Sequence, residues 1–515
     1  IPVVGGDEPP VVAVGNPENA AVPIEPLTRV GGEFAAWAED GKTITWALGR
    51  VFFRYDVAAA GRGQSAHRQP AYEAAETEIV IEVPRARPRG VVALAGARLI
   101  TMKGREVVDN GVIVVRDNRI AAVGPRGRVR IPPEARIIDV SGATIMPGLV
   151  DIHAHIWPAW DVHRTQVWEY LANLVYGVTT TRDPQTATTD ILTYRDLVET
   201  GRMIGPRVYG TGPGVFASDN VESLDEARDV LKRYSRYWDT KTIKQYMAGN
   251  RRQRQWLIMA ARELRLMPTT EGGLDYRLDM THALDGYPGI EHTLPIIPAY
   301  EDVIELFKAS GTTNTPTLLV SYGGPFAENW FYTHENVAGD AKLRHFTPKA
   351  ELDPKVRRRN PGPGPGGWFR DDEYAFRRHA AWIKQLLEAG GRAGVGSHGQ
   401  LQGLGYHWEL WAIASGGLSH HDALRAATLL GAEAIGLGQD LGSLEPGKLA
   451  DLLVLEKNPL EDIRHTNTLR YVMKNGRLYD ANTLDEVWPR QRAAPDEPWR
   501  HTAPAVQAGI RGGAR

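Results

Sequence analysis

The chain has 515 residues, enough for more than one domain, and its 60 Lys and Arg against 62 Asp and Glu give a net charge of −2. This balance excludes a global field that would recruit nucleic acid or an anionic membrane. The chain has no cysteine, which excludes disulfides, a thiol nucleophile and cysteine-ligated zinc; any metal must be held by histidine, carboxylate or a modified lysine. We find no apolar run of membrane-spanning length and no signal-peptide pattern after Ile1.

The N-terminal part predicts a small β unit. Residues 29–56 alternate short strands around an Asp40-Gly41 turn, a pattern typical of one β-propeller blade. A single blade cannot bury its faces, and the chain opens at Ile1 in a Pro- and Gly-rich stretch without methionine. We therefore expect this chain to be the C-terminal part of something longer. A small independent β appendage is the alternative.

Two sets of strands far apart in the sequence predict one small sheet domain split by an insertion. The first set includes 91–94, 97–102, 111–116 and 119–124. The turn at 116–119 joins two of these runs as a hairpin. A matching set returns at 447–455 and 471–479.

The inserted stretch, about 148 to 440, alternates β-branched apolar runs with helical windows such as 222–237 and 372–389. The eight candidate strands are 149–153, 177–182, 206–210, 242–246, 267–271, 289–292, 315–320 and 393–398. This alternation fits a (β/α)₈ barrel better than an open doubly wound sheet. In such barrels the catalytic groups lie at the carboxyl ends of the strands.

The first candidate strand ends in His153 and His155. Because side chains alternate along a strand, both imidazoles point the same way. Two neutral imidazoles on one face suit a first-row metal ion, so we predict that both are ligands.

Other polar residues fall at the ends of later strands, and each has a structural alternative. His292 and His398 are candidate ligands; His292 could instead be a hydrogen-bonded core histidine, and His398 a turn residue that orients Ser397. Lys244 lies in an apolar strand, where an ammonium must be paired or chemically altered. Carbamylation would make it an anionic ligand able to bridge two metals, whereas pairing with Glu271 is the alternative. Glu271 could be a ligand, a general base or only that partner.

Other catalytic signatures are absent. The run GVGSHG at 394–399 fits GxGxxG, but it occurs late in the chain and without the early βαβ setting of a dinucleotide site. There is no P-loop and no HExxH motif. Ser397 lacks the nucleophile-elbow spacing because Val395 stands where the first glycine should be.

Two segments are too irregular for a regular element. Residues 360–367 are rich in proline and glycine and are expected to form a lid or a partner-facing loop. The tail from about 490 is expected to be flexible or bound to a partner.

With these residues in place, the chain resembles the amidohydrolase superfamily of metal-dependent hydrolases. The matching runs are MPGLVDIHAH at 146–155, YGVTTTRD at 176–183, IEH at 290–292 and GSLEPGKLADL at 442–452. Within the superfamily the chain is most similar to the imidazolonepropionase-like and prolidase-like group, in particular to long members that carry a TolB-like propeller. That likeness accounts for the isolated blade.

The resemblance implies five segments: a propeller-like β segment with a linker (1–88), two parts of a split β-sandwich (89–147 and 441–488), a hydrolase barrel (148–440) and a tail (489–515). It implies one or two divalent metals, most plausibly zinc. It also implies the rest of a propeller as a partner, an oligomer, and a periplasmic or extracellular location.

The sequence departs from the superfamily pattern at two strand ends. The fifth strand usually carries histidine, where this chain has Glu271, and the eighth carries aspartate, where it has His398. That aspartate normally takes a proton from the attacking water, so the general base is left open between Glu271 and His398.

The predicted function is hydrolysis of a C–N bond in an amide, peptide-like or cyclic amide substrate by metal-activated water. Tyr246 and Tyr322 are candidate oxyanion donors, with rim packing as the alternative. Arg251, Arg252 and Arg254 could hold a substrate carboxylate, with a solvated helix start as the alternative. An ester or lactone hydrolase, or a degenerate binding module, are the other functions considered.

Overall fold

The computed structural model describes residues 24, 26–60, 73–356 and 369–501. The predicted loop at 360–367 and the end of the tail lie outside these residues. The chain divides into two compact units. One contains residues up to 83 together with 219–241 and 252–266, and the other contains the rest. The predicted barrel segment, 148–440, includes 219–241 and 252–266, so this grouping differs from the prediction.

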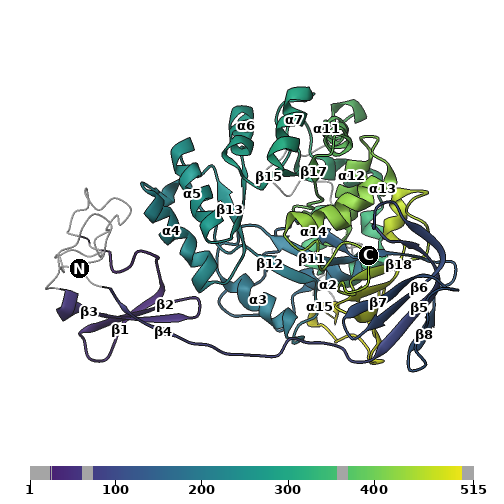
Figure 1. The fold of residues 1–515 in the computed structure, drawn as a ribbon, viewed down its shortest axis with the longest axis horizontal. Coiled ribbons are helices and arrows are strands. Elements are labelled where there is room, and N and C mark those ends of the chain that lie inside the picture. The colour runs from purple at the N-terminus through teal and green to yellow at the C-terminus, as the bar shows by residue number, and fades with distance from the viewer. Residues whose placement is uncertain (1–23, 25, 61–72, 357–368, 502–515) are drawn as a thin grey trace, which may run out of the picture. The chain divides into compact units, whose positions relative to one another are not determined.

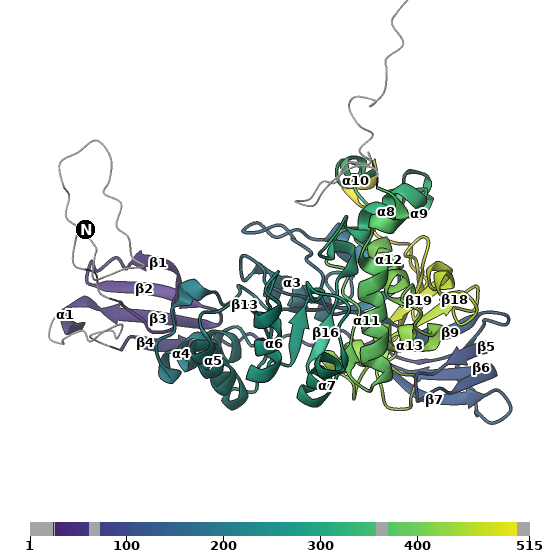
Figure 2. The ribbon, with the colours of Figure 1, turned by 90° about the horizontal axis from the view of Figure 1, so that it is seen from above.

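The first unit contains an antiparallel four-stranded sheet in the order β1-β2-β3-β4 (Figures 1 and 2). Its strands are β1 (Glu33–Trp37), β2 (Thr43–Leu48), β3 (Val51–Asp56) and β4 (Ala75–Glu78), with the short helix α1 (Val57–Ala60) after β3. The same unit contains α4 (Leu224–Lys232), η3 (Arg233–Tyr237) and most of α5 (Arg251–Glu263). The strands around the Asp40-Gly41 turn are present as predicted. The propeller stays a prediction.

In the second unit, strands from both ends of the sequence form one nine-stranded sheet, in the order β21-β20-β19-β18-β9-β5-β6-β7 with β8 paired to β5. The strands from the first set are β5 (Val91–Ile100), β6 (Val107–Arg116), β7 (Arg119–Pro125), β8 (Arg136–Asp139) and β9 (Thr144–Pro147). Those from the second are β18 (Leu452–Leu455), β19 (Leu469–Lys474), β20 (Arg477–Asp480) and β21 (Glu486–Trp488). Strand β18 runs antiparallel to β9. The predicted joining of the two sets and the hairpin between β6 and β7 are therefore both observed.

Lys474 is a buried cation in this sheet and makes the sheet's stability pH-dependent. Burial and the neighbouring Arg207 lower the pKa of Lys474 to about 8. The unfolded chain, in which lysine has its ordinary pKa of 10.5, binds this proton more tightly. The free energy of unfolding contributed by this site should therefore rise as pH increases from about 8 to 10.5, and should be lowest at neutral pH.

Replacing Lys474 by Met should remove that rise and should increase the free energy of unfolding at neutral pH by on the order of 3 kcal/mol. Urea unfolding of both proteins across this pH range measures the effect. Parallel stability curves for the two proteins would show that the pKa of Lys474 is the same in the folded and unfolded states.

The segment between the two sets of sheet strands forms parallel strands in two sheets, of order β10-β11-β12 and β13-β14-β15-β16-β17. Their bounds are Leu149–Asp151, Val178–Asp183 and Arg207–Gly210 for the first sheet, and Thr242–Tyr246, Met267–Glu271, Gly289–Glu291, Thr313–Thr315 and Arg392–Ala393 for the second. Backbone hydrogen bonds connect the two sheets at both sides. Val215 N donates to Lys244 O at 2.9 Å, and His398 N donates to His153 O at 2.7 Å.

Helices separate the parallel strands in sequence (Figure 1). Besides α4 and α5, they are α2 (Trp168–Val175), α3 (Asp190–Glu199), α6 (Tyr276–Asp285), α7 (Glu301–Ser310), α8 (Ala327–His334), α9 (Ala341–Phe346), α10 (Lys349–Val356) and α11 (Phe376–Glu388). Helices α12 (Leu404–Ala414), α13 (His420–Arg425) and α14 (Gly431–Ala434) follow the last parallel strand, and α15 (Pro498–His501) follows β21. Helix α12 is buried over residues 404–413, as expected for a helix that is apolar on all sides. Among the described residues, no helix has both the length and the apolarity to cross a membrane.

The predicted strand at 315–320 is wrong over most of its length. Strand β16 ends at Thr315, and residues Leu318–Val320 form a 3-10 turn, η4. Pro316 has no N–H to donate to a neighbouring strand. The buried carboxylate of Glu409 accepts hydrogen bonds from Leu318 N and Leu319 N at 2.7 and 2.9 Å. These amides are therefore satisfied without a strand partner.

Candidate metal centre

Four imidazoles converge at the carboxyl ends of the parallel strands. The ring centroids of His153 lie 5.1 Å from His155, 5.0 Å from His292 and 5.1 Å from His398. One potential ligand atom from each of His153, His292 and His398 lies within 4.8 Å of the other two. The structure thus brings together all four histidines that the sequence analysis selected as ligands.

A buried carboxylate orients His153. Glu291 lies at the end of β15, and its Oε2 accepts a hydrogen bond from His153 Nδ1 at 2.6 Å. Its Oε1 accepts from Arg182 Nη1 at 2.9 Å. Although burial alone would raise it, His153 and Arg182 hold the pKa of Glu291 well below its ordinary range. An ionised carboxylate only accepts hydrogen bonds, so the His153 proton lies on Nδ1 and its Nε2 carries a lone pair.

That lone pair points at a second imidazole. Nε2 of His153 lies 3.3 Å from Nε2 of His155, whose own Nδ1 is buried without a hydrogen-bond partner in the described part of the chain. Burial lowers the pKa of His153, His155 and His398 well below the ordinary histidine value. Neutral imidazoles gathered this closely are the donor set that a first-row divalent cation requires. The residues present therefore fit a metal ion.

His398 is placed by the glycine-rich run around it. Its Nδ1 lies 3.1 Å from Gln400 Oε1, which leaves Nε2 as the free acceptor. A Cβ on Gly396 would lie 2.7 Å from the Cβ of His153, and one on Gly399 would lie 2.1 Å from the carbonyl oxygen of His155. The GxGxxG spacing thus lets the last strand segment pack directly against the first, which supports rejecting a dinucleotide site.

Lys244 and Glu271 form the second part of the site. Lys244 is fully buried, and its Nζ lies 2.8 Å from Glu271 Oε2. The same oxygen accepts from His292 Nε2 at 3.0 Å, while His292 Nδ1 lies 2.7 Å from Thr317 Oγ1. Although burial alone would raise it, Lys244 and His292 hold the pKa of Glu271 well below its ordinary range. The alternative considered for Lys244, a partner for Glu271, is the arrangement observed.

Two further buried carboxylates lie beside the histidines. Asp151 accepts hydrogen bonds from Ser397 Oγ at 2.6 Å and from His153 N at 3.2 Å, and burial raises its pKa to about 7. Ser397 is therefore a donor to Asp151, in agreement with the rejection of a serine nucleophile. Asp183 lies 3.9 Å from His155 Nδ1, and burial raises its pKa to about 8.

The two predicted oxyanion donors lie at the edge of the cluster. The Tyr246 ring stacks on Phe216 at 4.9 Å and contacts Lys244 Nζ at 4.9 Å. The Tyr322 ring lies 6.2 Å from the His292 ring. Burial raises the pKa of both phenols, so each keeps its proton at neutral pH. Their role as donors stays a prediction.

The predicted carboxylate-binding arginines already have other contacts. Arg251 Nε lies 2.8 Å from the buried Asp285 carboxylate, and the Arg252 guanidinium lies 4.8 Å from the Trp256 ring centre. Arg254 is buried. These contacts favour the structural alternative for Arg251 and Arg252, and their substrate role stays a prediction.

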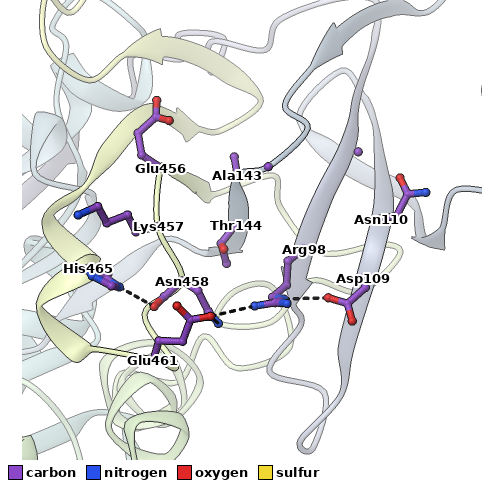
Figure 3. Close-up of a pocket in the computed structure, with 12 residues that line it drawn as sticks. Arg98, Asp109, Asn110, Ala143, Thr144, Glu456, Lys457, Asn458, Glu461 and His465 are labelled. Atoms are coloured by element: carbon purple, nitrogen blue, oxygen red, sulfur yellow. Dashed lines mark hydrogen bonds and ion pairs between the residues drawn. The ribbon is translucent and has the colours of Figure 1, made fainter.

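A hollow of about 460 Å³ lies elsewhere, on the nine-stranded sheet (Figure 3). Its cation Arg98 is paired with Asp109 at 2.8 Å and with Glu461 at 3.6 Å. His465 Nδ1 donates to the carbonyl oxygen of Asn458 at 2.8 Å. The main polar groups of this hollow thus satisfy one another, and none of the clustered histidines lines it.

Sequence reasoning missed the residues that support the histidines. The runs that match the superfamily pattern include Glu291, Arg182 and Asp183, but the roles of these three residues were not predicted. The available signal was a charged residue inside an apolar strand, because such residues are seldom buried unless they are paired.

Comparison with known proteins identifies the family of this chain. A family model described as the amidohydrolase family matches residues 144–479. The chain belongs to the amidohydrolase family. It is an enzyme of that family, and the four histidines, Lys244 and Glu271 all lie inside the matched segment.

Individual relatives are distant. This chain is 24% identical over 459 residues to an imidazolonepropionase from Symbiobacterium thermophilum. The alignment covers 79% of this chain and 100% of the relative. A solved Xaa-Pro dipeptidase is 20% identical with a TM-score of 0.57, covering 76% of this chain and 100% of the dipeptidase. An A. niger ochratoxinase is 19% identical with a TM-score of 0.56, covering 76% and 96%. The two structures show the likeness of fold alone.

Proposed function

We propose that this amidohydrolase is a metal-dependent hydrolase that cleaves the C–N bond of an amide, peptide-like or cyclic amide substrate. The observation that carries the proposal is the convergence of four imidazoles beside the Lys244–Glu271 pair. The imidazolonepropionase and dipeptidase likenesses support a C–N bond as the target. We further propose that the two parallel sheets close into a (β/α)₈ barrel, in support of which backbone hydrogen bonds connect them at both sides.

The histidines would hold the metal, and Glu291 fixes the ligating nitrogen of His153. A divalent ion in this position supplies Lewis acidity toward water and a substrate carbonyl. We propose zinc, with one or two ions. As the alternative to its pairing with Glu271, a Lys244 carbamylated by carbon dioxide would supply the anionic oxygen ligand of a two-metal site, and it would then no longer be the cationic donor to Glu271.

Glu271 is the proton acceptor that we propose. Ligation through His292 Nε2 requires this nitrogen to give up the proton that it now donates to Glu271. Glu271 then keeps Lys244 as its principal donor, so its carboxylate becomes more basic. While His292 Nε2 donates to it, Glu271 has a lowered pKa and is a weak base. It becomes an effective proton acceptor only after His292 Nε2 has given up that proton, so proton transfer depends on His292 acting as a ligand.

The hydroxyl groups of two tyrosines lie at the edge of the same site. The phenols of Tyr246 and Tyr322 are protonated at neutral pH, and a protonated phenol can donate to an oxygen that gains negative charge during the reaction. Phenylalanine at either position should lower kcat more than it raises KM, if the hydrogen bond forms mainly in the transition state.

Removal of metal tests the proposed function. Dialysis against a chelator should abolish hydrolysis of a panel of acyl-dipeptides, cyclic amides and lactones, and Zn²⁺ or Mn²⁺ should restore it. Preferential turnover of lactones would favour the ester hydrolase, because the same attack serves both bonds. Absence of turnover together with absence of metal binding would favour the degenerate binding module.

The domain arrangement, the partners and the location of the enzyme form a separate proposal. We propose the five segments named from the sequence as its domains, and propose a propeller, supplied by the same precursor or by another chain, as its partner. The four-stranded sheet β1–β4 supports this partner because one blade has that size. An oligomeric state and a periplasmic or extracellular location complete the proposal.

A further inference from the structure

Aromatic rings contact two residues of the site, His155 and Lys244. Trp157 stacks on His155 with ring centroids 5.7 Å apart and an interplanar angle of 26°. Trp160 extends this contact outward at 6.2 Å from Trp157. The stacked pair of Phe216 and Tyr246 adjoins Lys244. We name Trp157, Trp160, Phe216 and Tyr246 the aromatic rim.

The rim leaves an unusual amount of aromatic surface in contact with solvent. Trp157 is 52% exposed, Trp160 43% and Phe216 38%. Large aromatic rings are mostly buried in folded proteins. An exposed apolar patch beside a polar site therefore indicates a surface that a bound ligand covers.

Trp157 is also held in a strained conformation. Its φ is 47°, in the left-handed region that costs a bulky residue about 1–2 kcal/mol. The neighbouring Ile156 N donates to the buried Asp183 carboxylate at 3.2 Å, which fixes the chain just before the tryptophan. The strained backbone at Trp157 therefore holds the indole over His155, a candidate metal ligand.

We propose that the aromatic rim is a substrate subsite for an uncharged, planar apolar group, such as a phenyl ring, attached close to the scissile amide. This inference rests on the proposed function and names its substrate class. Because Trp157 touches His155, a ring covered by the rim lies within a few bonds of a carbonyl at the histidines.

The charges near the rim argue for a neutral group. The rim consists of two tryptophans, a phenylalanine and a tyrosine, side chains that carry no charge at neutral pH. A cationic group would be attracted to an aromatic face, but the Lys244 ammonium already occupies the face of Tyr246 at 4.9 Å. An apolar ring gains from burial against these faces without competing with Lys244.

Substrates that share one scissile bond test the subsite. We expect wild-type enzyme to hydrolyse N-phenylacetylglycine with a kcat/KM about 100-fold above that for N-acetylglycine, the value of a well-buried phenyl group. Trp157→Ala and Phe216→Ala should each lower this ratio about tenfold. Leu284→Ala, which removes a 61% exposed side chain on α6, should leave the ratio unchanged. Equal ratios in wild type and both rim variants would overturn the subsite.

A binding measurement separates the subsite from the hydrolase proposal. In the full chain labelled with 5-fluorotryptophan, phenylacetate should shift the fluorine resonance that Trp157→Phe removes, and acetate should not. This shift in a protein that hydrolyses no amide would support the rim and overturn the proposed function. Hydrolysis without the shift, and without a preference for the phenylacetyl substrate, would overturn the rim alone.

Discussion

Replacing His153 by Ala should abolish hydrolysis, with a loss of at least about 10³-fold in kcat/KM, and should reduce metal content to background. His153 contacts each of the other three imidazoles, so its loss removes the central donor of the cluster. Elemental analysis and turnover measured on the same preparation check the result.

The fold should survive this change. His153 lies beyond the last residue of β10, and its backbone contacts do not depend on the imidazole. Circular dichroism should therefore resemble wild type. A variant that retains turnover would show that the catalytic site has been misassigned.

Replacing Glu291 by Gln should weaken metal binding about 10- to 100-fold and lower the free energy of unfolding by about 3–5 kcal/mol. The amide nitrogen of glutamine would donate to His153 Nδ1, which moves the histidine proton to Nε2 and removes the ligating lone pair. Arg182, 2% exposed, would lose its charged partner. Titration against a competing chelator and urea unfolding measure the two effects.

Asp451→Asn is the matched control. Asp451, directly before β18, pairs with the buried Arg207 of β12 at 3.4 Å, so its replacement also breaks a buried ion pair. It should destabilise the protein without changing metal affinity. If Glu291→Gln lost stability but bound metal as wild type does, the orienting role of Glu291 would be rejected. Nitrogen NMR of the histidine tautomers would show the cause directly.

Local pattern was sufficient to predict several strands and the residues at their ends. Strands β13 and β14 have the predicted bounds, because helical segments flank each run, although β14 contains Pro268. His153 and His155 lie beyond β10, which ends at Asp151, yet their Nε2 atoms are 3.3 Å apart as the HxH spacing predicted. These features depend on neighbours in the sequence.

Features that depend on distant partners were not predictable in the same way. The amides of Leu318 and Leu319 are satisfied by Glu409, about 90 residues later in the chain, so a run typical of a strand forms a 3-10 turn. Glu291 meets Arg182 across 109 residues. Its role becomes visible only when the side chains at the ends of β10, β11 and β15 meet in the folded structure.

Anomalous X-ray diffraction from crystals of Zn²⁺-loaded protein tests the central claim most directly. We predict a zinc peak within about 2.0–2.1 Å of imidazole nitrogens from His153 and at least two of the other clustered histidines. A peak at another group, such as the His163–Asp190 pair, with none at the cluster, would contradict it.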